Sequence, residues 1–182
     1  MNIFFISDTH FFHTNIIKYC SRPFKNVHEM NETMIKNWNS RVKKDDLVFH
    51  IGDFGFRYAP GETPDAPKNA CEIIKSKLNG TIILIEGNHD KGGRNGLKTP
   101  IQNLTIKHGG KRIFLVHNPE FCNVNYDFNI VGHSHEKWKF KRFKRGENFT
   151  DCCNLSVEQW DYKPVTWNEI WQAYSRWLKE KK

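Results

Sequence analysis

Hydrophobic residues along the chain form short runs, separated by longer segments in which apolar positions recur every three or four residues. The short runs are four or five residues long, rich in Ile, Val and Phe, and bounded by polar residues, which is typical of buried β-strands. They lie at Asn2–Ile6, Leu47–Ile51, Thr81–Ile85, Arg112–Val116 and Phe128–Val131. Strands that alternate with helical segments predict an α/β fold.

Three other segments have the periodicity of helices that face a core. The apolar positions of the first two are Met30, Met34, Ile35 and Trp38, and Ala70, Ile73, Ile74 and Leu78. The third helix is predicted to begin at Thr166, which forms a capping box with Glu169, and its apolar face continues from Ile170 to Leu178. Two segments rich in Gly or Pro, 54–67 and 91–100, are predicted to be loops.

Length and composition narrow the class of protein. A chain of 182 residues is predicted to form one domain, residues 1–182. Its apolar runs are far shorter than the roughly 18 residues of a membrane helix, and its start lacks the pattern of a secretory signal, so we expect no membrane association and a cytoplasmic protein. The net charge of +8 favours an anionic partner.

Carboxylate, amide and imidazole side chains follow almost every predicted strand. Asp8 and His10 follow the first strand, and Asp53 follows the second. The complete set is Asp8, His10, Asp53, Asn88, His89, Asp90, His117, His133 and His135. Five of the nine histidines belong to this set, a concentration that random placement would not produce. Ligands of α/β sheets usually bind at loops after strand ends, so these side chains are predicted to form one site.

The chemistry of the set indicates a metal centre. In "SDTH" and "GHSH" the ligand-type residues stand two apart, and such residues project to one side of an extended segment, so each pair could bind one ion. Mixed oxygen and nitrogen ligands suit Mn²⁺, Fe, Co²⁺, Ni²⁺ or Zn²⁺ better than Ca²⁺, and the oxygen-rich set favours Mn²⁺. The candidate ligands are Asp8, His10, Asp53, Asn88, His117, His133 and His135.

These ligands are too many for one ion, but two ions held roughly 3.5–4 Å apart by a bridging carboxylate would use them all. Asp53 stands alone at its strand end and is the natural bridge. Two divalent ions outweigh the charges of Asp8 and Asp53, so the site would attract a phosphate ester. The sequence therefore predicts a phosphoesterase, preferably of diesters, in which a hydroxide bridging two metal ions attacks phosphorus in line.

The stretch "IEGNHDKGG" places two further candidates beside a ligand. Asn88 can bind a metal while His89 contacts the phosphate or donates a proton, and we expect Asp90 to orient that imidazole. Both His89 and Asp90 are therefore predicted to be catalytic.

The motifs "DTH", "GDF", "GNHD", a lone His117 and "GHSH", in this order, resemble the calcineurin-like metallophosphoesterase superfamily, in particular its small, single-domain bacterial and phage branch. The resemblance implies a four-layer α/β/β/α sandwich. It also implies that Asp53 is shared by two metal positions. One position would use Asp8, His10, Asp53 and His135, and the other Asp53, Asn88, His117 and His133. Asn118 follows His117 where family members usually have glycine, so a different local loop is expected.

Three residues near these motifs are candidates for substrate binding. His13 could touch substrate or could be an ordinary loop histidine that packs on neighbouring aromatic residues. Arg22 and Arg57 could each bind a phosphate through two hydrogen bonds, or could be solvated or paired with protein groups.

The segment Lys137–Arg145, "KWKFKRFKR", carries six basic residues in nine and is predicted to be a strand with one basic face. It could bind a nucleic-acid backbone or a nucleotide, or could be a solvated edge strand protected by its lysines. The alternatives to a general phosphoesterase are thus a nuclease or nucleotide-processing hydrolase and, less favoured, a non-catalytic interaction module on the same fold. The natural substrate, the native metal and the oligomeric state stay open from sequence.

Overall fold

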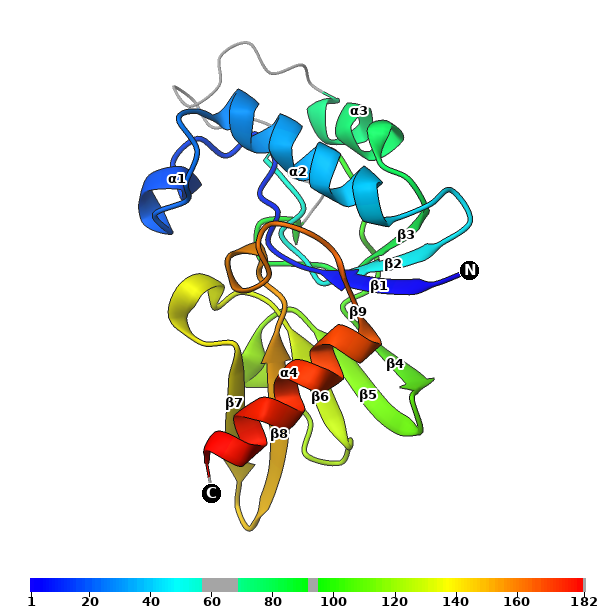
Figure 1. Ribbon diagram of the computed structural model, residues 1–182, viewed down its shortest axis with the longest axis vertical. Helices are drawn as coiled ribbons and strands as arrows, with labels where there is room; N and C mark the ends of the chain where they lie inside the picture. The colour runs from blue at the N-terminus through cyan, green and yellow to red at the C-terminus, as the bar shows by residue number, and fades with distance from the viewer. Residues whose placement is uncertain (57–68, 92–94, 182) are drawn as a thin grey trace.

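The computed structural model describes residues 1–56, 69–91 and 95–181, and these residues form two β-sheets flanked by helices. In Figure 1 the helices α1, α2 and α3 lie over the first sheet, and the second sheet lies below it with α4 across its front. The predicted α/β class, with two sheets between helices, is confirmed.

The first sheet has the strand order β3-β2-β1-β9. Strands β1 (Ile3–Ile6), β2 (Leu47–His50) and β3 (Thr81–Leu84) are parallel, and the short β9 (Val165–Thr166) pairs with β1 in the antiparallel sense. Because the three parallel strands end at the same edge of the sheet, the segments that follow them meet there.

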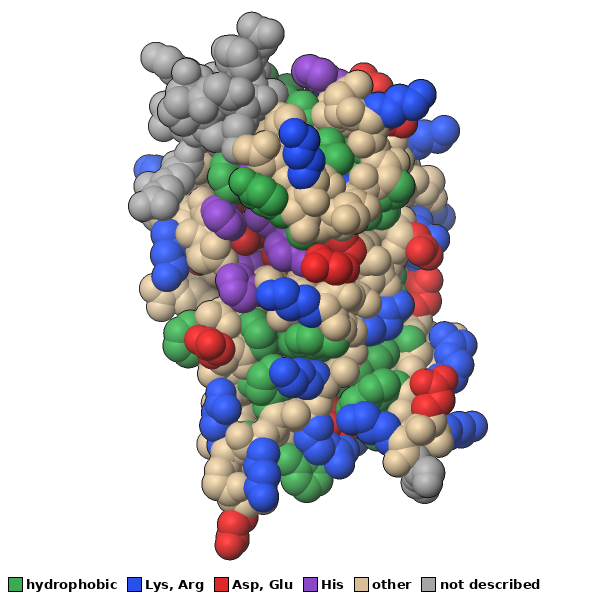
Figure 2. Space-filling view, turned by 90° about the vertical axis from the view of Figure 1, so that its left-hand side faces the viewer, with side chains coloured by type: hydrophobic (Ala, Val, Ile, Leu, Met, Phe, Trp, Pro, Cys, Tyr) green, Lys and Arg blue, Asp and Glu red, His purple; other side chains and the backbone are tan. Residues whose placement is uncertain are grey.

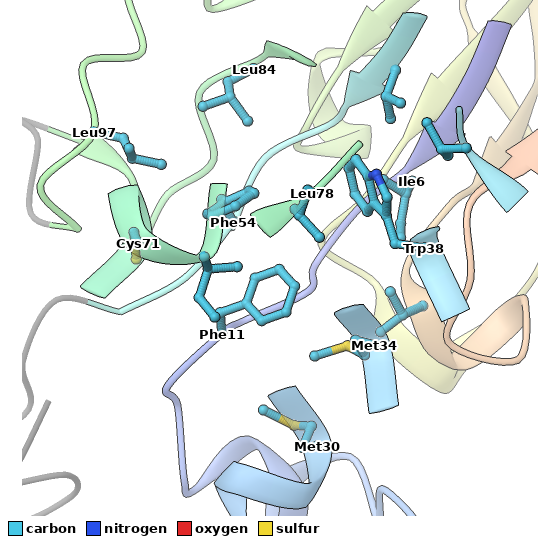
Figure 3. Packing of buried hydrophobic residues seen from close by; sticks show 14 of the residues in the cluster. Ile6, Phe11, Met30, Met34, Trp38, Phe54, Cys71, Leu78, Leu84 and Leu97 are labelled. Atoms are coloured by element: carbon cyan, nitrogen blue, oxygen red, sulfur yellow. The ribbon is translucent and has the colours of Figure 1, made fainter. Parts of the chain in front are cut away.

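Helices α1 (Ile16–Tyr19), α2 (Val27–Arg41) and α3 (Ala70–Lys77) belong to the layer over the first sheet. The side chain of Asn26 starts α2 by accepting a hydrogen bond from the N–H of Glu29. Most of the apolar face predicted for α2 is buried with Phe11 and Phe54, which come from the segments after β1 and β2 (Figure 3), and Ile35 is partly buried against the same core. Burying each such side chain contributes about 1.5–3 kcal/mol, so this core fixes the segments that carry the candidate ligands.

The second sheet has the order β4-β5-β6-β8-β7. Its strands are β4 (Asn103–His108), β5 (Lys111–Val116), β6 (Phe128–Val131), β7 (Phe140–Arg145) and β8 (Asn148–Asn154). Strands β5, β6 and β8 are parallel, and three short 3-10 helices lie in the segments that follow them. These are η2 (Pro119–Phe121), η3 (His135–Lys137) and η4 (Val157–Gln159).

Helix α4 (Trp167–Glu180) begins with the predicted capping box of Thr166 and Glu169. It packs on the second sheet through aromatic contacts of Tyr174 with Phe128 and Phe140. Those two phenylalanines share their core with Phe5 of the first sheet. The helix and the first sheet therefore cover the same face of the second sheet, and the opposite face carries a smaller cluster of its own.

The basic segment does not form the predicted strand with one basic face. Residues 135–137 form η3, so the strand starts only at Phe140. Within β7 the side chains alternate. Arg142 binds Asp151, on the face covered by α4, and Lys141 lies over Trp138 and Phe143, whose rings pack on the opposite face. Positive charge is consequently divided between the two faces of the edge strand.

Candidate metal centre

The segments that leave β1 and β2 run side by side beyond the sheet and bring two carboxylates together. The N–H of Asp8 donates to the carbonyl of Gly52 at 3.0 Å, and the N–H of His10 donates to that of Asp53 at 3.1 Å. Asp8, His10 and Asp53 are all at most 1% exposed. This backbone pairing is why residues more than forty positions apart in sequence line the same site.

Five of the predicted ligands have left-handed backbone conformations. Their φ values are 56° at Asp8, 50° at His10, 56° at Asp53, 67° at His133 and 44° at His135. Such conformations cost a non-glycine residue of the order of 1–3 kcal/mol and cluster at functional sites. The expectation that the "SDTH" and "GHSH" pairs lie in extended segments is therefore wrong. The backbone instead bends at each of these residues, so the side chain of each one points in its own direction.

Two glycines let these segments approach one another. A Cβ atom on Gly87 would collide with the carboxylate of Asp53, and one on Gly132 would collide with the side chains of Ser7 and Asp8. The glycines in "GNHD" and "GHSH" therefore provide space for the adjoining carboxylates.

One group of ligand atoms consists of Asp8, His10 and His135, which lie within 4.8 Å of one another. Nε2 of His10 is 3.8 Å from Oδ1 of Asp8, and Nε2 of His135 is 3.7 Å from the same oxygen. The other carboxylate oxygen of Asp8 accepts the hydroxyl of Ser156, and the N–H of His133 is shared between both oxygens, at 3.1 Å from Oδ1 and 3.0 Å from Oδ2. Oδ1 of Asp8 is thus the oxygen that faces the two imidazoles.

A second group consists of Asp53, His117 and His133, whose ligand atoms also lie within 4.8 Å of one another. The amide oxygen of Asn88 is 3.0 Å from Nε2 of His117 and 2.9 Å from Nδ1 of His133, so it belongs to the same group. His133 and His135 contribute to different groups, although they are only two residues apart. This is a consequence of the left-handed backbone at both.

Asp53 lies between the two groups. Its Oδ2 atom is 3.5 Å from Nε2 of His10 and 3.3 Å from Nε2 of His117. Its Oδ1 atom accepts the N–H of His89 at 2.9 Å, which fixes the orientation of the carboxylate. One oxygen is therefore available to both groups at once.

The two buried carboxylates of the site favour positive charge beside them. Burial would raise the pKa of the Asp8 carboxyl, but His117, His10 and His135 outweigh it and hold that pKa well below its usual range. Burial would lower the pKa of His117, but Asp8 and Asp53 outweigh it and raise the pKa to about 9. For His10, burial dominates and lowers the pKa to about 4. The two carboxylates thus favour positive charge at His117, and a cation bound at Nε2 would take the place of the proton there.

Protein oxygens that are not candidate ligands determine which nitrogen of the His117 and His135 rings faces the metal centre. Nδ1 of His117 lies 2.8 Å from the carbonyl of Ile51, and Nδ1 of His135 lies 3.0 Å from Oε1 of Glu158. In each ring the contact with a protein oxygen places the proton on Nδ1 and leaves Nε2 as the lone-pair donor. Glu158 was not predicted from sequence. None of the sequence motifs that predicted the ligands includes it.

The donor set fits divalent cations. Nε2 of His10 is buried and makes no hydrogen bond with any described residue, although a polar atom in such a position normally has a partner. Two carboxylates, one amide oxygen and four imidazoles converge from five segments, and this mixture of oxygen and nitrogen suits first-row transition metals.

Figure 2 shows histidine side chains gathered around acidic ones in the middle of one face of the molecule. The model of the calcineurin-like phosphoesterase superfamily domain matches residues 1–148. The chain belongs to this superfamily. The family accounts for the clusters of metal-ligand residues, and together they support a metal-dependent phosphoesterase.

The chain is also similar to individual proteins and solved structures. An uncharacterized protein of Methanocaldococcus jannaschii, MJ1445, is 41% identical over 170 residues, which cover 90% of this chain and 86% of that protein. The crystal structure of AQ665 from Aquifex aeolicus, a protein of unknown function, has a TM-score of 0.67 and 29% identity and covers 94% of this chain and 98% of that one. A phosphoesterase from E. coli, YfcE, matches with a TM-score of 0.43 and 23% identity, over 92% of this chain and 82% of that one.

Arg22 does not face the site of this phosphoesterase-family chain. Its guanidinium donates to the carbonyls of Asp8 and Thr9 and twice to Oε1 of Glu158, and its side chain is fully buried. The prediction that Arg22 binds substrate is therefore corrected. Through its hydrogen bonds to the backbone, the arginine stabilises the left-handed conformation at Asp8.

Asp90 has a different role from the predicted one. Its carboxylate accepts the N–H groups of Asp53, Phe54 and Gly87 and the side-chain amide of Asn95. The expectation that Asp90 orients the imidazole of His89 is wrong, because these donors occupy the carboxylate. Asp90 instead ties the loop after β3 to the loop after β2, which places Asn88 next to Asp53.

The remaining candidates differ in exposure. His89 has a side chain that is 41% exposed, with Nε2 4.0 Å from Oδ2 of Asp53, so it stands at the opening of the centre. His13 is buried, stacks on Phe56 and has Nδ1 3.2 Å from Nδ1 of His10, as expected of a packed loop histidine. Arg57 lies outside the described residues. Among the described helices, none combines the length and the apolar character needed to cross a membrane.

Proposed function

We propose that the protein is a dinuclear metal-dependent phosphodiesterase. The observation that carries the proposal is the position of Asp53, whose Oδ2 atom lies 3.5 Å from Nε2 of His10 and 3.3 Å from Nε2 of His117. A carboxylate shared by two groups of ligands is what a pair of cations requires. Asp8, His10 and His135 would hold one cation with Asp53, and Asn88, His117 and His133 would hold the other.

When bound, two divalent cations would supply an activated water nucleophile and neutralise the charge that develops on the phosphoryl oxygens. The chain provides the geometry for this chemistry. The left-handed backbone at the ligands and the hydrogen bonds of Asp90 hold the site before substrate arrives, so little reorganisation accompanies the reaction.

His89 is the candidate proton donor. Its imidazole is partly exposed and close to Asp53, while its backbone N–H is fixed by Oδ1 of that residue. As the bond from water oxygen to phosphorus forms and the bond from phosphorus to the leaving oxygen breaks, His89 would give its proton to that oxygen. Positioning for proton transfer of this kind is worth about 10²–10⁴-fold in rate.

We base the preference for diesters on Arg22, whose guanidinium already donates its hydrogen bonds to protein groups. A monoester dianion carries one more negative charge than a diester, and an arginine could pair with it through two hydrogen bonds. Arg22 gives its donors to Asp8, Thr9 and Glu158 instead. The use of the basic strand to hold a nucleic acid is not carried forward, because the basic residues of β7 are divided between two faces and Arg142 is paired with Asp151.

The test is to load the purified protein with Mn²⁺, measure its metal content, and compare hydrolysis of bis(p-nitrophenyl) phosphate with that of p-nitrophenyl phosphate. We expect about two ions per chain and faster hydrolysis of the diester. Asp53→Asn should lower both metal content and activity, whereas Asp45→Asn, a matched change at a 75% exposed aspartate, should alter neither. Full activity after exhaustive chelation, or an unchanged metal load in Asp53→Asn, would contradict the proposal. Two bound ions without hydrolysis would favour the non-catalytic interaction module.

A further inference from the structure

A cleft of about 500 Å³ opens directly beside the candidate metal centre. It is lined by Glu86, Gly87, Asn88, Lys91, Gln102, Asn103, Phe114, Val116, His117, Asn118 and Phe121. Asn88 and His117 thus belong both to the cleft and to the second group of ligands. A ligand in the cleft would be continuous with a phosphate at the centre, and the volume is within the range of small-molecule sites.

The floor of the cleft is apolar and aromatic. Phe114 and Val116 lie on β5, on the face of the second sheet that α4 leaves uncovered, and the ring of Phe114 packs on Tyr126. Phe121 of η2 stands at the cleft with 67% of its surface exposed. An exposed aromatic ring beside an apolar floor offers a stacking surface for a flat ligand.

The rest of the cleft is polar in a specific way. The amides of Gln102, Asn103 and Asn118 can donate and accept hydrogen bonds, and Lys91 and Glu86 carry opposite charges. A lipid chain would leave these groups without partners, and a small alkyl substituent would leave the aromatic floor in water. A planar ring with hydrogen-bonding edges satisfies both parts of the wall.

We propose that this cleft binds the nucleoside portion of a phosphodiester whose phosphate lies at the metal centre. The inference rests on the proposed phosphodiesterase function and names the substrate class of that site. The base packs against Phe121 and Phe114, its edge meets the amides, and the phosphate reaches the centre past Asn88 and His117. The substrate class is thus nucleotide diesters rather than simple alkyl or lipid diesters.

Two substrates with the same leaving group separate the cleft from the chemistry. One is the p-nitrophenyl ester of thymidine 5′-monophosphate, and the other is methyl p-nitrophenyl phosphate. Both release p-nitrophenolate when water adds to phosphorus, so they differ only in the group that remains esterified to the phosphate, which is thymidine in one and methyl in the other. With the Mn²⁺-loaded protein we expect kcat/KM to be about tenfold or more higher for the nucleoside ester, the size of effect that base stacking provides.

Variants locate the effect in the cleft. Phe121→Ala should reduce the ratio of the two kcat/KM values toward one, and Phe121→Tyr should restore it because the ring is retained. The control is Phe149→Ala, which removes a similarly exposed aromatic ring from β8, 57% exposed, and should leave the ratio unchanged. A ratio near one in the wild-type protein, or an equal loss on both substrates in Phe121→Ala, would overturn the proposal.

A binding measurement keeps the test independent of turnover. Calorimetric titration of the metal-loaded protein with thymidine 5′-monophosphate and with methyl phosphate should show about tenfold tighter binding of the nucleotide, lost in Phe121→Ala. If neither ester is hydrolysed but this difference in binding is found, the phosphodiesterase proposal fails while the nucleoside cleft stands. Equal binding of the two phosphates would exclude the cleft as a nucleoside site, whatever the activity.

Discussion

Nδ1 of His135 lies 3.0 Å from Oε1 of Glu158, and Nε2 of the same ring lies 3.7 Å from Oδ1 of Asp8. The imidazole therefore lies between the carboxylate of Glu158, outside the candidate metal centre, and that of Asp8, within it. Arg22 binds the same oxygen of Glu158, so this carboxylate is fixed from two sides. Carboxylates in this position orient a metal-binding histidine and increase its basicity.

Glu158→Gln should accordingly weaken cation binding at the Asp8 side of the centre. A neutral amide cannot hold a proton on Nδ1 of His135 as strongly, and loss of such a partner typically lowers metal affinity by about 10–100-fold. Competition of the protein with a metal-binding dye measures the affinity. Glu136→Gln changes an exposed neighbour in η3 and should have no effect. Unchanged affinity in Glu158→Gln would show that the ring is oriented by other contacts.

His89→Ala should separate metal binding from turnover. The side chain is 41% exposed and the adjacent Asn88 provides the candidate ligand, so the metal content should stay at the wild-type level. Turnover of a diester with an alkyl leaving group should fall by about 10²–10⁴-fold, and that of a p-nitrophenyl diester by less, because p-nitrophenolate needs little protonation. His28→Ala, at an exposed position of α2, serves as the control. A lost cation in His89→Ala would contradict the assigned role.

Gly87→Ala should damage the centre by steric displacement. The added Cβ would meet the carboxylate and the backbone nitrogen of Asp53, and overpacking of this kind costs about 1–3 kcal/mol. We expect a lower melting temperature together with reduced metal content. In Gly146→Ala the added Cβ has open space, and only the left-handed backbone, φ 59°, opposes the change. That variant should lose about 1–2 kcal/mol and keep its cations.

Asp151 should contribute to stability in a pH-dependent way. Burial would raise its pKa, but hydrogen bonds from Arg142 and Tyr174 outweigh burial and lower it. A carboxyl whose pKa is lower in the folded state stabilises the protein above its unfolded pKa of about 3.9. That contribution is lost as the pH falls through the folded pKa.

Asp151→Asn should therefore be less stable than wild type at pH 7, by about 1–3 kcal/mol, and the difference should shrink below pH 4. Urea unfolding of the metal-free protein between pH 3 and pH 7 measures it. Asp161→Asn, at an 87% exposed site, should follow the wild-type curve. A difference that is constant with pH would mean that charge plays no part.

Much of the fold and the site was predictable because both follow from local rules. Strands β1, β2 and β3 are parallel and end at one edge of the first sheet, so the segments of Asp8, Asp53 and Asn88 were expected to meet. His117 follows β5 of the second sheet, and it reaches Asp53 and Asn88 because the two sheets pack together. The capping box at Thr166 is equally local, since it depends on residues three apart, and it is confirmed. Family motifs supplied the sharing of Asp53, which local rules alone only suggested.

The predictions that were wrong concern residues whose roles depend on contacts with residues distant in sequence. Arg22 was a candidate for substrate binding because arginine suits phosphate, and the alternative, pairing with protein groups, is the one found. Its partner Glu158, 136 residues away, could not be identified from local sequence. Asp90 was assigned to its neighbour His89, whereas the carboxylate holds the loop of Asp53. The left-handed backbone at Asp8 and His133 is maintained by surrounding hydrogen bonds. The residue types Asp and His do not predict this conformation by themselves.

The last part of the chain completes the site that the first part begins. Ser156 and Glu158 reach Asp8 and His135, and β9 pairs with β1, so the first strand lies between neighbours from both halves of the sequence. During synthesis, β1 can pair with β2 early but can pair with β9 only after all the segments between them have been made. A chain released early would carry carboxylates and imidazoles with no fixed geometry. The geometry of the candidate ligands therefore depends on contacts with Ser156 and Glu158, far along the chain from Asp8.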